Sequence, residues 1–132
     1  MSATPQFAST PRASSVAVST ANANRDGTGT VGTVIIAGSS GTRISRVVIK
    51  ALGTTTAGMV RLFLHDGTNY ILLCEVLVSA ITASATVAAF EALMNELDNG
   101  NVLPLTIPSG WSLRASTEKA ESFRVTALGA DL

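Results

Sequence analysis

The chain has 132 residues, nine basic and nine acidic side chains, and a charged fraction of 14%, well below the roughly 25% of a typical soluble domain. This length fits one domain, and the balanced charge gives no electrostatic attraction to nucleic acid or to an anionic membrane surface. A single cysteine and a single histidine exclude an intrachain disulfide and an ordinary zinc site, so we expect a protein without a cofactor. Because so few charges protect the surface from association, we also expect the protein to be packed against copies of itself or partners.

The N-terminal segment is rich in Ser, Thr and Ala, with a lone Phe7. Such a segment cannot bury enough apolar surface to order itself. We therefore expect an extended N-terminal arm over residues 1–24 and a β-sandwich domain over residues 25–132. Val16 and Val18 alternate with small residues, which favours an additional edge strand in the last third of the arm.

A glycine-rich stretch, RDGTGT at residues 25–30, follows the arm. It looks superficially like a phosphate cradle, but it has neither the Gly-Lys-Ser/Thr ending nor a following helix. It leads directly into the β-branched run at residues 31–36. We expect a flexible entry into the first strand.

Eight strand candidates are recognised by period-two alternation and β-branched content. They cover residues 29–37, 43–52, 58–65, 70–80, 86–93, 101–107, 111–117 and 122–129. Turn signals stand between them at residues 38–41, 53–56, 66–67, 99–100, 108–110 and 118–121. The clearest is Asp66-Gly67, which predicts a tight hairpin. The stretch 86–97 is ambiguous because its Ala, Glu, Leu and Met favour a helix; we expect a strand that runs into a loop, with one helical turn at most.

Regularly spaced strands without a long helix predict an all-β protein, a two-sheet antiparallel β-sandwich that is jelly-roll-like and carries the extended arm. An immunoglobulin-like sandwich is the alternative, although its Cys…Trp…Cys spacing is absent. The longest apolar run, at residues 70–81, is too short to span a bilayer and contains Glu75, and no targeting signal is visible. We expect synthesis in a reducing cytoplasm and no membrane partner.

Catalytic and metal-binding patterns are weak. His65 ends a predicted hairpin strand, where a structural imidazole is the simplest interpretation, and no serine lies in a nucleophile turn. Glu91, Glu96 and Asp98 cluster in sequence, but their loop setting favours a solvated turn over an acid–base pair. An oxygen-rich turn at residues 66–69 lacks the Asp-x-Asp-x-Asp-Gly spacing of ligands that is typical of a calcium-binding loop. We expect no enzymatic activity, no metal and no cofactor.

The aromatic residues fall in different predicted strands, which favours the core. Trp111 follows a predicted turn and is the best candidate for an interface anchor instead. Nucleic-acid binding needs basic residues interleaved with exposed aromatics, and only 5% of the residues are aromatic. We expect no nucleic-acid partner.

Four segments carry a resemblance to a known class of proteins: residues 21–30 (ANANRDGTGT), 53–70 (GTTTAGMVRLFLHDGTNY), 110–117 (GWSLRAST) and 121–125 (ESFRV). They resemble small virion proteins of tailed phages, which tend to be encoded beside the major capsid protein. The chain is also similar in size and strand content to phage capsid decoration (cement) proteins, some of which are jelly rolls.

This resemblance implies a structural protein on the capsid surface, made in the bacterial cytoplasm. It implies a homo-oligomer, dimer or trimer, that binds the major capsid protein and clamps neighbouring capsomers. No catalytic residue comes with it. A rigid sandwich with little charge suits this role, and an extended arm is able to add a strand to a neighbour's sheet.

We expect the partner contacts to come from the arm and from arginines and an aromatic residue of the strands: Phe7, Val16, Val18, Arg43, Arg46, Arg61, Trp111 and Arg114. The alternative for the arginines is an ordinary solvated strand face. The alternative for the whole protein is a tail, baseplate or fibre component, with a carbohydrate-binding sandwich as one form. The turn at residues 66–69 with Tyr70 is then the candidate sugar site.

Overall fold

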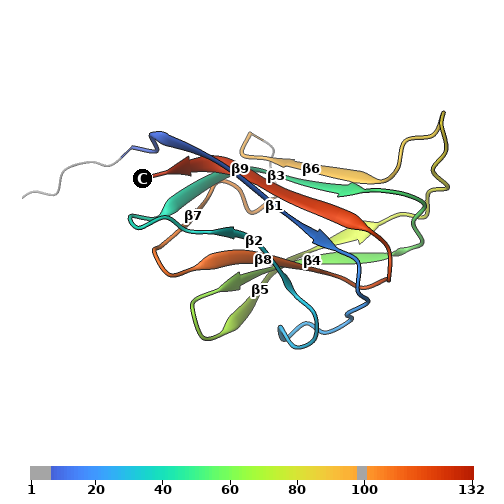
Figure 1. Cartoon of the computed structure of the whole chain (residues 1–132), viewed down its shortest axis with the longest axis horizontal. Coiled ribbons are helices and arrows are strands. Elements are labelled where there is room, and N and C mark those ends of the chain that lie inside the picture. Colours follow the sequence, from blue (N-terminus) through green and yellow to red (C-terminus); the bar gives the residue numbers. More distant parts are fainter. Residues whose placement is uncertain (1–6, 98–100) are drawn as a thin grey trace, which may run out of the picture.

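The structure is a computed structural model that describes residues 7–97 and 101–132. Every regular element in these residues is a β-strand, and the strands form two antiparallel sheets packed face to face (Figure 1). The predicted all-β sandwich is confirmed. Among the described residues there is no helix long and apolar enough to cross a membrane.

The nine strands are shorter on average than their sequence patterns suggest, because pairing ends before the alternation does. They are β1 (Thr10–Val18), β2 (Gly32–Ile36), β3 (Thr42–Ala51), β4 (Gly58–His65), β5 (Tyr70–Val78), β6 (Glu91–Asn95), β7 (Leu105–Ile107), β8 (Ser112–Thr117) and β9 (Phe123–Asp131).

The strand order identifies the sandwich as a jelly roll. The first sheet has the order β1-β9-β3-β6, with β7 also paired to β3, and the second has the order β2-β8-β4-β5. In Figure 1 the first sheet is the upper layer and the second the lower one. The chain crosses between the sheets at almost every connection, so strands that are neighbours in a sheet are mostly distant in sequence. This double Greek-key order is that of a jelly roll.

Apolar residues from both sheets fill the space between the layers. Ile44, Val47 and Ile49 of β3 are buried in the same core as Leu62 of β4 and Leu113 of β8. Each buried aliphatic side chain of this kind contributes roughly 1.5–3 kcal/mol. The alternation that predicted these strands thus marks their inner faces.

The β4–β5 hairpin matches its prediction closely. Asp66 donates its backbone N–H to the carbonyl of Asn69 at 3.2 Å, and its carboxylate accepts the backbone N–H groups of Thr68 and Asn69 at 2.9 and 2.7 Å. Gly67 has a φ of +100°, which glycine adopts without strain.

Two elements differ from expectation. Strand β1 pairs with β9 along all nine of its residues, whereas the sequence favoured an edge strand only in the last third of the arm. The division of the chain at residue 24 stays a prediction. In the ambiguous stretch, the strand begins only at Glu91, and residues 84–87 form a turn closed by Ser84 and Val87. The predicted turn at 99–100 lies outside the described residues.

The β1–β2 loop, residues 19–31, is a folded cover and not the flexible entry that we expected. Ala21 forms a parallel bridge with Thr117 of the second sheet. The buried Asn22 donates its amide to the carbonyls of Thr28 and Thr30, both at 2.9 Å. The loop therefore crosses the outer face of the second sheet and holds its own shape.

The described chain enters and leaves the sandwich at one corner (Figure 1). Ser9 donates its N–H to the carbonyl of Asp131 at 3.0 Å. The Asp131 carboxylate also accepts from Arg12 at 2.9 Å and from the Thr42 hydroxyl at 2.6 Å. One carboxylate thus ties β1, β3 and β9 together.

Candidate interaction surfaces

The predicted contact residues do not form one cluster. Phe7 is 79% exposed, just before β1. Val16 lies on the inner side of β1 and packs against the core. Trp111 is half-buried and packs against the core from the position just before β8. These positions give no shared surface.

Two predicted contact residues are corrected, because the chain buries them itself. Val18 lies in the core between the sheets. Arg61 is 1% exposed, although it lies on the outer face of the second sheet. The β1–β2 loop covers that face, and a loop from a distant part of the sequence is invisible to strand periodicity.

Arg61 is held in this covered layer by carboxylates. Its Nε donates to Glu75 at 2.9 Å, and its Nη2 lies 3.8 Å from a carboxylate oxygen of Glu118. Arg25, from the loop, donates to the same oxygen of Glu75 at 2.8 Å. The hydrogen bond from Arg25, together with that from Arg61, holds the pKa of Glu75 below its usual range. Arg61 therefore fastens the loop cover to the sheet.

The hairpin end of the second sheet is also closed by its own residues. Arg114 donates to the Tyr70 hydroxyl at 2.9 Å, and its guanidinium lies 5.4 Å from the centre of that ring. The His65 ring is 4.5 Å from the same ring, and Gly27 packs against it from the loop. Tyr70 is thus engaged on several sides, which leaves it poorly placed to stack on a sugar.

The outer face of the first sheet gathers basic side chains. Arg43, Arg46 and Lys50 of β3 and Arg124 of β9 lie on it, and we name these four residues the basic face. Residues 43 and 46 differ in parity, so regular alternation would put them on opposite faces. A register shift at Ser45 brings both to the same side, which is the usual effect of a β-bulge.

The basic face is only partly neutralised within the chain. Arg43 pairs with Glu96, and Lys50 stands opposite Glu91 on one side and opposite Arg124 on the other. Like charges directly opposite each other destabilise a sheet. Arg46 is exposed and forms no side-chain hydrogen bond or ion pair with any of the described residues. A partner with acidic groups would relieve this repulsion.

A shallow hollow of about 340 Å³ adjoins the basic face. Its lining consists of Arg46, Val48, Leu93, Met94 and Asn95. The aliphatic groups give the face a contact area for an apolar group beside the charges. The sequence pattern indicated Arg43 and Arg46 as contact residues but missed Lys50 and Arg124. The alternation of Arg124 with core residues of β9 could have shown that it points outward. That β9 lies beside β3, which brings Arg124 to the same face, could not be read from the sequence.

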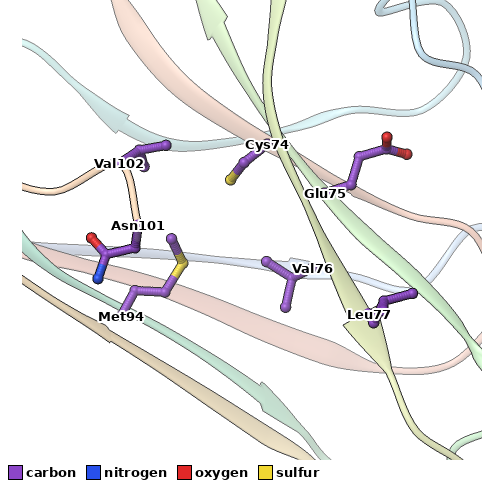
Figure 2. A pocket seen from close by; sticks show the side chains of 7 residues that line it. All are labelled: Cys74, Glu75, Val76, Leu77, Met94, Asn101 and Val102. Carbon is purple, nitrogen blue, oxygen red and sulfur yellow. The ribbon is translucent and has the colours of Figure 1, made fainter. Parts of the chain in front are cut away.

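A second surface lies at the side of the sandwich where β5 and β6 are the edges of their sheets. A hollow of about 360 Å³ separates these strands. Figure 2 shows Cys74 and Val76 pointing from β5 toward Met94 and Val102, while Glu75 and Leu77 point to the other side of β5. Cys74 packs against the core, and burial raises the pKa of its thiol, which favours a packing role over a nucleophilic one.

Within residues 7–97 and 101–132 no group of three or more His, Cys, Asp and Glu side chains is placed to hold a metal ion. The two surfaces that stand out are therefore a charged face and an apolar edge. Both are of the kind that contacts other macromolecules.

No family model and no curated protein matches this chain. One solved structure that is similar in part is that of infectious bursal disease virus, Gt strain, with 15% sequence identity and a TM-score of 0.35. The match covers 98% of this chain and 34% of that one, so this chain spans about a third of its length. A likeness of this size carries no conclusion about what this chain binds.

Proposed function

We propose that this protein is a structural component of a tailed-phage virion that binds the outside of the capsid and stabilises it by bridging neighbouring capsomers. Its partners in this role are the major capsid protein and further copies of itself. It acts as a rigid binding module and not as an enzyme. The resemblance of its sequence to small virion proteins suggests the class, and the surfaces of the fold suggest how it attaches.

The basic face is the observation that carries the proposal. Four of the nine basic side chains lie on one flat side of a jelly roll, an architecture that is common among capsid domains. The side chains between them are aliphatic or small, as Val48 and Thr126 are. Such a face fits an acidic protein surface, whereas a nucleic-acid site would place aromatic rings between the charges.

The arm contributes differently from what we expected. Because residues 10–18 already pair with β9 of the same chain, they are not free to add a strand to a neighbour. Phe7, exposed ahead of β1, is the part of the expected arm contact that remains available. We place the main shell contact on the basic face.

Binding to capsids that lack this protein tests the proposal. Purified protein should saturate expanded capsids at a fixed ratio of copies to shell subunits, and the affinity should fall with rising salt because exposed charges are screened. The double variant Arg46→Glu/Arg124→Glu should lower the affinity roughly tenfold or more.

Lys119→Glu is the matched control, since Lys119 is an exposed basic residue outside the basic face, in the β8–β9 loop. It should bind within a factor of about two of the unchanged protein, as expected for a charge outside an interface. Equal binding by the double variant and the unchanged protein would remove the basic face from the proposal. Density for this chain at a tail, baseplate or fibre in intact particles would replace the capsid role by the alternative.

A further inference from the structure

Strand β5 is an edge strand with little of the protection that edge strands usually carry. Proteins keep such edges from pairing by short length, charged side chains (Lys above all), Pro, β-bulges or a covering segment. β5 has nine residues, contains neither Lys nor Pro, and within the described residues pairs with β4 alone. A register shift at Leu73 interrupts its pairing with β4 but leaves the outer edge open on both sides of that residue.

The other three edges are better protected. β2 and β6 have five residues each. β1 carries Pro11 and Arg12, and Gly32 of β2 packs against Val16 of β1, which closes that side of the sandwich. The exposed apolar side chains concentrate around β5 and β6: Ile71, Leu77, Leu93 and Leu97 are half of the eight large apolar side chains that stand exposed among the described residues, and all lie on β5, on β6 or just after β6.

We infer that β5 pairs antiparallel with β5 of a second copy, around a two-fold axis, so that the two second sheets form one continuous eight-stranded sheet. A pairing of the edge with itself uses up the edge of both copies and stops there. Pairing of β5 with a different edge is head-to-tail, so it leaves another β5 open at every step and gives fibres unless the rotation between copies closes a ring.

The charges along the edge suit a second copy. Glu75 is the only charged residue of β5, and Arg25 and Arg61 already bind it on the outer side. Regular overlap of the residues that follow the register shift, Cys74–Val78, centres on Val76 and sets each Glu75 opposite Leu77 of the other copy, so no like charges face each other. The formal net charge of zero adds no repulsion between copies.

A dimer interface of ordinary size would cover only a small part of the chain's surface, around the β5 edge. A standard interface buries roughly 800 Å² per partner, about a tenth of the 7063 Å² accessible surface of this chain. The β5 edge and the hollow beside it, with Cys74, Val76, Leu77, Met94 and Val102 in its lining, supply an apolar contact.

The pairing suggests how the protein would bridge capsomers, and this part of the inference rests on the proposed function. An antiparallel pair of strands in one sheet has its two-fold axis perpendicular to the sheet. The two copies therefore turn the same side outward, and both basic faces point in one direction. A dimer of this kind has two shell-binding faces side by side and is able to bridge two capsomers.

Sedimentation of the full chain tests the pairing without a capsid. The protein should sediment as a dimer of the 13.5 kDa chain at micromolar concentration. Ile71→Lys/Leu77→Lys should shift it to the monomer. Leu52→Lys/Val87→Lys is the matched control, because Leu52 and Val87 (65% and 46% exposed) resemble Leu77 and Ile71 (73% and 42%) but lie in loops away from β5.

Hydrogen exchange of the unchanged protein gives a second measurement that does not depend on the folding of a variant. Amides of Tyr70–Val78 should become more protected as the protein concentration rises, and the edge strands β1 and β2 should not. A monomer at all concentrations, a dimer that survives the β5 substitutions, or protection confined to another edge would overturn the inference.

The capsid assay keeps the two proposals apart. A β5 variant that is monomeric and still binds capsids, but more weakly, supports both, because two linked contacts bind more tightly than one. A dimer that fails to bind capsids would overturn the capsid role and leave the pairing in place.

Discussion

Asp131 of β9 acts at one corner of the sandwich as a shared acceptor for β1 and β3. The hydrogen bond from Thr42, and then the hydrogen bond and charge of Arg12, hold the pKa of its carboxyl below the usual range. A carboxyl with a lowered pKa stabilises the folded state above its unfolded pKa of about 3.9, and the contribution is lost as the pH falls through the folded value.

Asp131→Asn should therefore lower the unfolding temperature at pH 7, because it removes the charge that Arg12 and Thr42 bind. The difference between variant and unchanged protein should stay constant above about pH 5 and shrink as the pH falls below about 4. Thermal unfolding followed by circular dichroism from pH 2 to 8 measures it. A difference that does not change with pH would show that the carboxylate charge is not what the corner uses.

Gly27 shows how closely the loop cover fits the second sheet. Its φ is +89°, and a Cβ atom there would lie 2.2 Å from Cγ of Tyr70. Gly53, in contrast, has open space around its Cα and a φ outside the left-handed region.

Gly27→Ala should cost about 2 kcal/mol or more, from backbone strain and from displacement of the Tyr70 ring. Gly53→Ala should change stability by less than about 1 kcal/mol, and it is expected to be slightly stabilising. Urea unfolding of both variants compares them directly. Equal stabilities would mean that the loop moves away from Tyr70 without cost.

The exposure of a side chain, and its face beside a bulge, were the hardest properties to predict. Periodicity places Arg61 on an outer face, which is true, but exposure depends on whether another segment covers that face. The Ser45 bulge likewise sets Arg43 and Arg46 side by side against their parity. Both effects come from segments and pairings that are remote in sequence.

At the scale of elements, strand β1 is the edge of the first sheet and part of its stability. It pairs with β9 over nine residues and supplies Val18 to the core. Loss of this strand is therefore expected to weaken the fold itself and not only a contact made by the arm.

Deletion of residues 1–18 should lower the unfolding temperature by well over 10 °C or abolish cooperative unfolding, because the β9 edge and the core beneath Val18 are then exposed. Deletion of residues 1–6 removes no part of β1 and should leave the unfolding temperature unchanged within about 2 °C. Calorimetry of both truncated chains distinguishes these outcomes. An unchanged transition in the longer deletion would show that β1 adds nothing to the sandwich.

Strands were predicted well where the residues are β-branched and turn signals are strong, as in β4 and β5. Strand β1 was understated, because Ser, Ala and Pro have low strand propensity and the strand is ordered by its partner β9. Strand β6 was placed too early, because the pairing of Glu91 with Lys50 fixes where that strand begins. Local sequence thus predicts strands such as β4 and β5, whose own residues favour the extended conformation. The bounds of β1 and β6 depend on pairing with strands that are distant in sequence.

At the scale of the whole molecule, the two candidate surfaces have separate proposed roles, one in binding the shell and the other in self-association. The basic face belongs to the first sheet, and the pairing edge belongs to the second. Self-association therefore leaves the shell-binding side uncovered. A module with this arrangement is able to bind a partner and a copy of itself at the same time, which is what bridging requires.

The corner where Ser9 meets Asp131 has a practical consequence for anyone who modifies this protein. A peptide fused ahead of β1 and one fused behind β9 would emerge at the same spot, so a tag placed at either position samples the same surroundings. For the same reason, a linker of a few residues would join the two positions and allow the chain to be opened in a loop elsewhere, such as residues 66–69, without altering the order of the strands.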